Sequence, residues 1–157
     1  MIAKKHVALA TLTVCALALS TLGSTKHPVE RPFKNHANAT WVLSLQDGSG
    51  EGQEWGEGTH VGRYTNQSSA IWDLDPAHFG IVSGQGTLTA ANGDEVFWVM
   101  TPEKPGVVQT TGGTGRFENA TGEITAVSLT VLSVDVDLDT LTMTMTLTYT
   151  GVGTITY

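Results

Sequence analysis

The chain has 157 residues, a length that fits one domain with its own core, and its single cysteine, Cys15, lies near the N-terminus. One cysteine excludes an internal disulfide, and it leaves no thiol for catalysis or metal binding after residue 23. The net charge of −7 becomes −9 if Lys4 and Lys5 are removed with a signal peptide, so nucleic acid and anionic lipid are repelled at long range. We therefore expect no nucleic-acid partner.

Residues 1–23 have the pattern of a secretory signal peptide, with a positively charged start, an uncharged apolar run over 7–22 and small residues in "LALSTLGST". The run is interrupted by threonines and serines, and it falls short of the roughly 20 apolar residues of a spanning helix. We predict a secreted or periplasmic protein with no stable membrane span in the mature chain. The alternative is a lipoprotein anchored through Cys15, although Val14 stands where a small residue is typical.

The next segment, 24–38, contains two prolines and no apolar period in "KHPVERPFKNHAN", which predicts a flexible leader. From Ala39 onward apolar residues recur at every second position, most clearly over 141–150, where threonines alternate with apolar side chains. Asn92-Gly93 is typical of a tight hairpin turn. Expected strands cover 41–46, 59–66, 69–74, 81–91, 95–101, 107–110, 123–134 and 141–150. Short strands joined by tight turns predict an antiparallel, eight-stranded, up-and-down barrel over 39–157, because closure removes exposed sheet edges.

The stretch 110–123, "TTGGTGRFENATGE", is rich in glycine, but the lysine and following helix of a phosphate-binding loop are missing. Glycine instead suits a sharp bend between two strands. We predict a structural corner in which Phe117 plugs the barrel end and Arg116 bonds backbone carbonyls, Glu118 or Glu123. The corner residues are Gly112, Gly113, Gly115, Arg116, Phe117 and Gly122.

The segment "GGTGRFENATGE" resembles the "GGTG-aromatic-x-x-A-x-G" signature of the allene oxide cyclase and dirigent barrels. The segments "GTHVGRYT" and "GQGTLTAANGDEVFW" are also similar to exported bacterial relatives of that superfamily, and the match spans roughly residues 41–157. The resemblance implies an eight-stranded barrel with an apolar interior, and it implies homo-oligomers as in the plant members. It carries over no catalytic residue, because the strands here show no matching polar motif.

Aromatic side chains on several expected strands are candidates for the wall of a ligand cavity, since such pockets are apolar with a few polar groups. The alternative is that they fill the core, because an eight-stranded barrel is narrow. Parity leaves open which face of 95–100 points inward, so the other face could meet a neighbouring subunit. The candidate ligand-binding residues are Tyr64, Trp72, Glu95, Trp98 and Tyr149.

Two acidic clusters could suggest a metal, but neither has a binding pattern, and we expect no metal and no cofactor. Asp135, Asp137 and Asp139 lack the glycine and glutamate spacing of a calcium loop, so a solvated charged face is favoured. Asp73, Asp75 and His78 are better explained by a turn, with a proton carrier or metal ligand as the alternative.

We expect the barrel to bind a small apolar molecule or to act as a non-catalytic assembly module. The alternative is an isomerase or cyclase for an apolar substrate, with Glu95, Tyr64 or His60 inside the barrel. Two or more ionisable side chains converging in a ligand-sized cavity would favour the enzyme, and a packed lumen would discard both functions.

Overall fold

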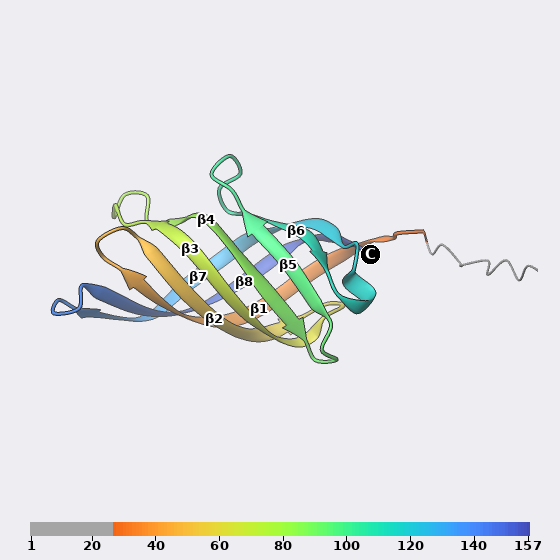
Figure 1. The fold of residues 1–157 in the computed structure, drawn as a ribbon, viewed down its shortest axis with the longest axis horizontal. Helices are drawn as coiled ribbons and strands as arrows, with labels where there is room; N and C mark the ends of the chain where they lie inside the picture. The colour runs from red at the N-terminus through yellow and green to blue at the C-terminus, as the bar shows by residue number, and fades with distance from the viewer. Residues whose placement is uncertain (1–26) are drawn as a thin grey trace, which may run out of the picture.

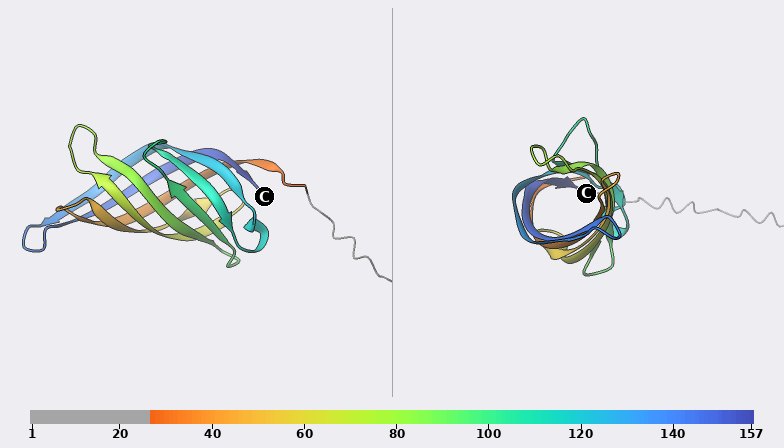
Figure 2. Two further views of the ribbon diagram at one scale, coloured as in Figure 1. Left: turned by 45° about the horizontal axis from the view of Figure 1, so that its top comes forward. Right: turned by 90° about the vertical axis from the view of Figure 1, so that its left-hand side faces the viewer.

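The computed structural model describes residues 27–157, and the predicted signal segment lies outside this range. Eight antiparallel strands form a closed barrel in which each strand pairs with its neighbours in sequence and β8 returns to β1, as Figures 1 and 2 show. The predicted all-β, up-and-down barrel is thus confirmed. No helix among the described residues is long and apolar enough to cross a membrane. The strands are β1 (Glu30–Ser44), β2 (Ser49–Gly58), β3 (Gly62–Asp73), β4 (Gly80–Ala90), β5 (Glu95–Met100), β6 (Val107–Gly113), β7 (Thr121–Asp137) and β8 (Thr142–Thr156).

The predicted boundary between leader and barrel is wrong, because β1 begins at Glu30 and not after residue 38. Residues 30–38 pair with β8 along their whole length, and Phe33 and Ala37 are buried inside the barrel. Every second residue of this segment faces inward, but only Phe33 and Ala37 among these inward residues are apolar. A strand with a half-polar inner face does not show the alternation that identifies strands in sequence.

Strand β2 was not predicted, and the two strands expected over 59–66 and 69–74 are one strand, β3. In β2 the inward positions are glycines apart from Glu54, so the segment "SGEGQEWGEG" has no apolar period at all. Glycine normally weakens a strand, and in a strand it often marks the close approach of another group. In β2 the approaching groups include the Leu43 side chain at Gly50 and the Trp41 ring at Gly52.

Two lumen tryptophans lie against glycines of neighbouring strands. A Cβ atom built on Gly52 would be 2.6 Å from the ring of Trp41, and one built on Gly86 would be 2.6 Å from the ring of Trp98. At both places a large inward residue therefore lies beside a small one on the next strand, which lets the ring fit into the narrow interior.

Gly86→Ala should lower the free energy of unfolding by about 1–3 kcal/mol, the usual cost of overpacking a core. The added methyl would press on the Trp98 ring and on the Gln67 carbonyl oxygen, 2.7 Å away. Gly80→Ala in the same strand is the matched control, since its Cβ would come no closer than 3.7 Å to the His78 carbonyl oxygen. Urea unfolding followed by tryptophan fluorescence measures both, and equal losses would contradict the prediction.

The barrel core consists of two clusters of buried side chains, with Tyr149 packed against both. The first cluster lies toward the glycine corner and includes Phe117, which is fully buried and meets the Tyr157 ring edge-on at 5.0 Å. The second contains Trp41 and Trp72, whose rings are 5.2 Å apart. Phe117 therefore occupies the predicted position of a plug at one barrel end.

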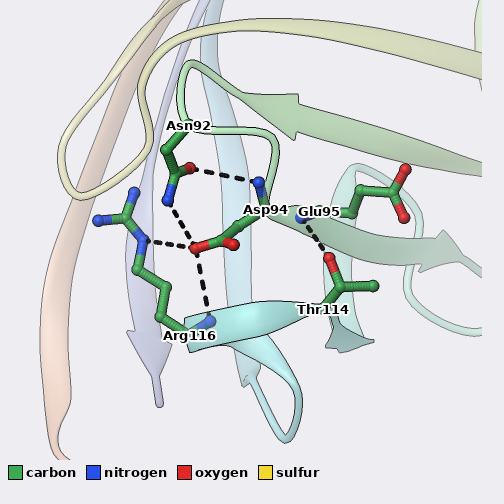
Figure 3. Close-up of polar contacts among 5 residues, drawn as sticks. All are labelled: Asn92, Asp94, Glu95, Thr114 and Arg116. Atoms are coloured by element: carbon green, nitrogen blue, oxygen red, sulfur yellow. Dashed lines mark hydrogen bonds and ion pairs between the residues drawn. The ribbon is translucent and has the colours of Figure 1, made fainter.

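The predicted corner connects β6 to β7 through a single turn of 3-10 helix, Gly115–Phe117, and it is held by the β4–β5 hairpin (Figure 3). The Asp94 carboxylate accepts a hydrogen bond from the Arg116 backbone N–H at 3.4 Å and pairs with the Arg116 guanidinium at 3.5 Å. The Glu95 N–H donates to Thr114 Oγ1 at 2.9 Å. The prediction that Arg116 bonds backbone carbonyls, Glu118 or Glu123 is wrong. Its side chain pairs instead with Asp94, a residue distant in sequence.

The segments "AANGDE" and "GGTGRFENATGE", two of those on which the predicted resemblance depends, therefore contact each other. Gly115 has a φ of +56°, and a Cβ there would lie 2.1 Å from Asp94 Oδ1. Glycine is needed at this position both for its backbone angle and for the approach of the carboxylate. These contacts give both segments a structural role at the barrel rim.

Candidate functional site

The barrel lumen contains a cavity of about 140 Å³ between the two core clusters. Its wall is mostly aromatic and aliphatic, with side chains from all eight strands. A dry apolar cavity of about 150 Å³ in another protein is large enough to bind benzene. The lumen is therefore neither fully packed nor wide, and it suits a ligand the size of one aromatic ring.

A small group of polar side chains interrupts the apolar wall, and Glu54 on β2 is its centre. Glu54 is 8% exposed, and the Tyr149 hydroxyl of β8 donates a hydrogen bond of 2.6 Å to its Oε2 atom. The Asn35 side-chain amide donates to the Tyr64 hydroxyl at 2.8 Å. Trp98 Nε1 donates to Asn66 Oδ1 at 3.0 Å. Five strands thus bring polar groups to one cavity.

Burial alters the acidity of three of these groups. Loss of solvation raises the pKa of Glu54, although the hydrogen bonds from Tyr149 and Asn66 oppose the rise. Burial is also the main cause that raises the pKa of Tyr64, and it raises the pKa of Tyr149 well above its ordinary value, with the nearby Glu54 charge adding to the effect. Burial therefore shifts the Glu54 carboxyl group toward its protonated form and the two phenols toward their neutral forms.

Three polar atoms of the cavity-lining residues are buried and have no hydrogen-bond partner within residues 27–157. They are Asn35 Oδ1, Trp72 Nε1 and Thr110 Oγ1. Buried polar atoms are nearly always paired, because leaving one unpaired costs about 1–3 kcal/mol. The residues that line the cavity thus leave one acceptor, one donor and one hydroxyl without a partner.

Four of the five predicted ligand-binding residues line this cavity: Tyr64, Trp72, Trp98 and Tyr149. Glu95 does not, because Val96, Trp98 and Met100 are the buried residues of β5, and the Glu95 carboxylate points away from the corner contacts in Figure 3. His60 is also outside the lumen, with Nε2 3.0 Å from the Pro32 carbonyl oxygen on the barrel rim.

Sequence reasoning missed Glu54, Asn35 and Asn66. Asn35 lies in the segment assigned to the leader, and Glu54 lies in the strand that was not predicted. The sequence contains one signal that Glu54 faces inward. Glycines occur at alternate positions on both sides of Glu54, and these positions form the inward face of β2.

The acidic clusters contribute nothing to the lumen. Asp137 Oδ1 accepts hydrogen bonds from the backbone N–H groups of Thr140 and Asp139, which lower the pKa of Asp137 and close the β7–β8 turn. Asp75 closes the β3–β4 turn in the same way, and His78 Nδ1 is 3.7 Å from its carboxylate. Within residues 27–157, no three His, Cys, Asp or Glu side chains are placed to hold a metal ion.

No protein-family model matches the chain, and no curated protein or solved structure matches it. The resemblance to the allene oxide cyclase and dirigent barrels therefore stays a prediction. The function is therefore inferred from the geometry of the lumen.

Proposed function

We propose that the barrel binds a small, largely apolar molecule that carries one or two polar groups, and that the lumen cavity is its site. The observation that carries this proposal is a ring-sized, mostly apolar cavity that is also lined by the polar residues Glu54, Tyr149 and Asn35. The apolar wall would supply most of the affinity, and Glu54, Tyr149 and Asn35 would orient the polar groups. We also propose that the protein is exported and that it is related to the allene oxide cyclase and dirigent barrels.

Benzene and phenol are suitable probes, because they differ only by a hydroxyl group. We expect both to shift backbone amide resonances of lumen residues in NMR titrations, and we expect phenol to bind more tightly because it gains a hydrogen bond in a mostly apolar site. Glu54→Gln should reduce this preference for phenol. If neither probe causes saturable shifts, the binding proposal is wrong.

A variant that fills the lumen supplies a second test. Val108 lines the cavity, so Val108→Phe should abolish binding of both probes, whereas Val107→Phe on the same strand should leave it unchanged because Val107 is not part of the wall. Equal affinities in the two variants would place the bound probe elsewhere.

A second function, proton-transfer catalysis on an apolar substrate, is favoured by one observation. Glu54, Tyr64 and Tyr149 are three ionisable side chains that converge on the cavity, which meets the criterion set for the isomerase alternative. Burial raises the pKa of Glu54, and this change moves a carboxyl group toward the range in which a general acid or base is effective. The test is exchange of the α-protons of cyclohexanone in D₂O. Catalysed exchange that Glu54→Gln removes would support this function, and a background rate would reject it for ketones of this size.

A further inference from the structure

Strand β7 is much longer than its pairing with β6. One edge pairs with β8 from Thr121 to Asp137, but the other pairs with β6 only from Gly122 to Thr125. Among the described residues, no strand pairs with that second edge over 126–137. Figure 1 shows the β7–β8 hairpin extending past the rest of the wall. Backbone N–H and C=O groups along this edge are therefore free to pair with another strand.

The free edge has few of the features that prevent strands from associating. Its sequence, "AVSLTVLSVDVD", contains no proline, lysine, arginine or glycine, and its first nine residues carry no charge. Two bulges, at Ala126/Ser128 and Val131/Ser133, and two aspartates at the far end are its only protection. The exposed fractions of its apolar side chains are 55% for Leu129, 42% for Val131, 59% for Leu132, 53% for Val134 and 48% for Val136.

We propose that this edge pairs with the same edge of a second copy of the chain, in antiparallel orientation about a two-fold axis. The distribution of charge selects this orientation. Parallel pairing would set Asp135 and Asp137 of the two copies side by side, in a chain that already carries a net charge of −7. Antiparallel pairing instead sets each acidic end beside the uncharged end of the other copy.

One antiparallel register also matches the side chains. With the axis between Leu132 and Ser133, Leu129 faces Val136 of the second copy and Val131 faces Val134. These four residues stand opposite inward-facing residues of β8, so they lie on one face of the sheet. Asp135 then faces Thr130, and Asp137 faces Ser128, whose hydroxyl groups can donate to carboxylates. An isologous interface of this kind closes after two copies.

The apolar character of the edge alone would also suit a small ligand, but a ligand of that kind cannot satisfy a row of backbone donors and acceptors. A strand can, because alternating N–H and C=O groups match those of an antiparallel neighbour. A second copy supplies such a strand with complementary side chains, and it would cover the apolar residues of β7 that the barrel leaves exposed.

Sedimentation velocity of the purified protein over 1–200 µM tests the proposal. We expect a concentration-dependent dimer, and we expect Leu132→Lys to raise its dissociation constant at least tenfold. Val42→Lys is the matched control, because Val42 is 48% exposed on the outer face of β1, which β8 separates from the free edge of β7. Circular dichroism and thermal unfolding establish that both variants are folded.

Disulfide trapping in a Cys15→Ser background gives a readout that does not depend on affinity. Ser133→Cys, next to the proposed axis, should form a covalent dimer under mild oxidation, and Thr144→Cys on β8 should not. A monomer at all concentrations, a dimer that Leu132→Lys leaves intact, or equal trapping at both positions would overturn the proposal. A higher oligomer would overturn it as well, since the two-fold arrangement leaves no free edge.

Discussion

Replacing Phe117 with alanine should reduce the free energy of unfolding by about 3–5 kcal/mol, the usual cost of removing a buried phenylalanine ring. The ring is fully buried, it meets Tyr157 edge-on, and the Arg116 guanidinium carbon lies 4.7 Å from its centroid. The surrounding residues belong to different strands and to the corner, so they cannot collapse together into the space. Because single domains are stable by only about 5–15 kcal/mol, this one change should remove a large part of the total.

Phe97→Ala is the matched control for this prediction. Phe97 lies on the outward-facing side of β5 and is 37% exposed, so its loss should cost about 1 kcal/mol or less. Guanidinium chloride unfolding gives both values from the shift in midpoint at constant slope. Similar losses of unfolding free energy in the two variants would show that Phe117 is not a plug, because its ring would then stabilise the barrel no more than an exposed phenylalanine does.

Phe117 also illustrates which parts of the fold could be predicted from the sequence. The glycines, with neither the lysine nor the helix of a phosphate-binding loop, indicated a bend. The aromatic residue within this bend indicated a plug. Both features could be predicted because they depend on residues that are close together in the sequence. Strand β8 was predicted for the same reason, since its threonines and apolar residues alternate without interruption. Its end at Thr156 was missed, because Gly151 and Gly153 break the pattern while the backbone continues to pair with β1.

The candidate site was harder to predict, because it depends on contacts between distant strands. Trp72, Trp98, Tyr64 and Tyr149 were found because aromatic residues on strands are usually buried. Glu54 was missed because nothing in "GEGQEWGEG" says that a charged side chain faces inward. Only the registers of β2 with β1 and β3 place it opposite Ala39 and Asn66 and within reach of Tyr149.

The position of Glu54 leads to the second large effect, a pH-dependent loss of stability that Glu54→Gln should remove. The folded protein raises the pKa of this carboxyl group above its ordinary value of 4.5. The folded state therefore binds the proton more tightly than the unfolded state. The resulting stability is complete below pH 4.5 and is lost as the pH rises through the raised pKa. Each pH unit between the two pKa values corresponds to about 1.4 kcal/mol.

Glutamine keeps the shape of the side chain and an oxygen acceptor for the Tyr149 hydroxyl, but it does not ionise. We expect the two proteins to have similar melting temperatures near pH 4, and we expect the variant to become progressively more stable than the parent toward pH 8. Tyr149→Phe should act in the opposite direction, because it removes the donor that faces the carboxylate, at a cost of about 1.5–3 kcal/mol once Glu54 is ionised.

Exposed carboxyl groups oppose this trend, and a control must separate them from Glu54. The pKa values of Asp47, Glu123 and Asp137 are lowered by their hydrogen bonds, so these groups contribute stability that is present above their ordinary values and lost as the pH falls. All three are present in both proteins, and the difference between parent and Glu54→Gln cancels them. Glu51→Gln is the matched control for removing a carboxylate from β2, because Glu51 lies on the exposed face of the same strand. A constant gap between parent and Glu54→Gln from pH 4 to pH 8 would mean that Glu54 is solvated. The lumen would then lack the dry carboxyl group that phenol recognition and proton transfer both require.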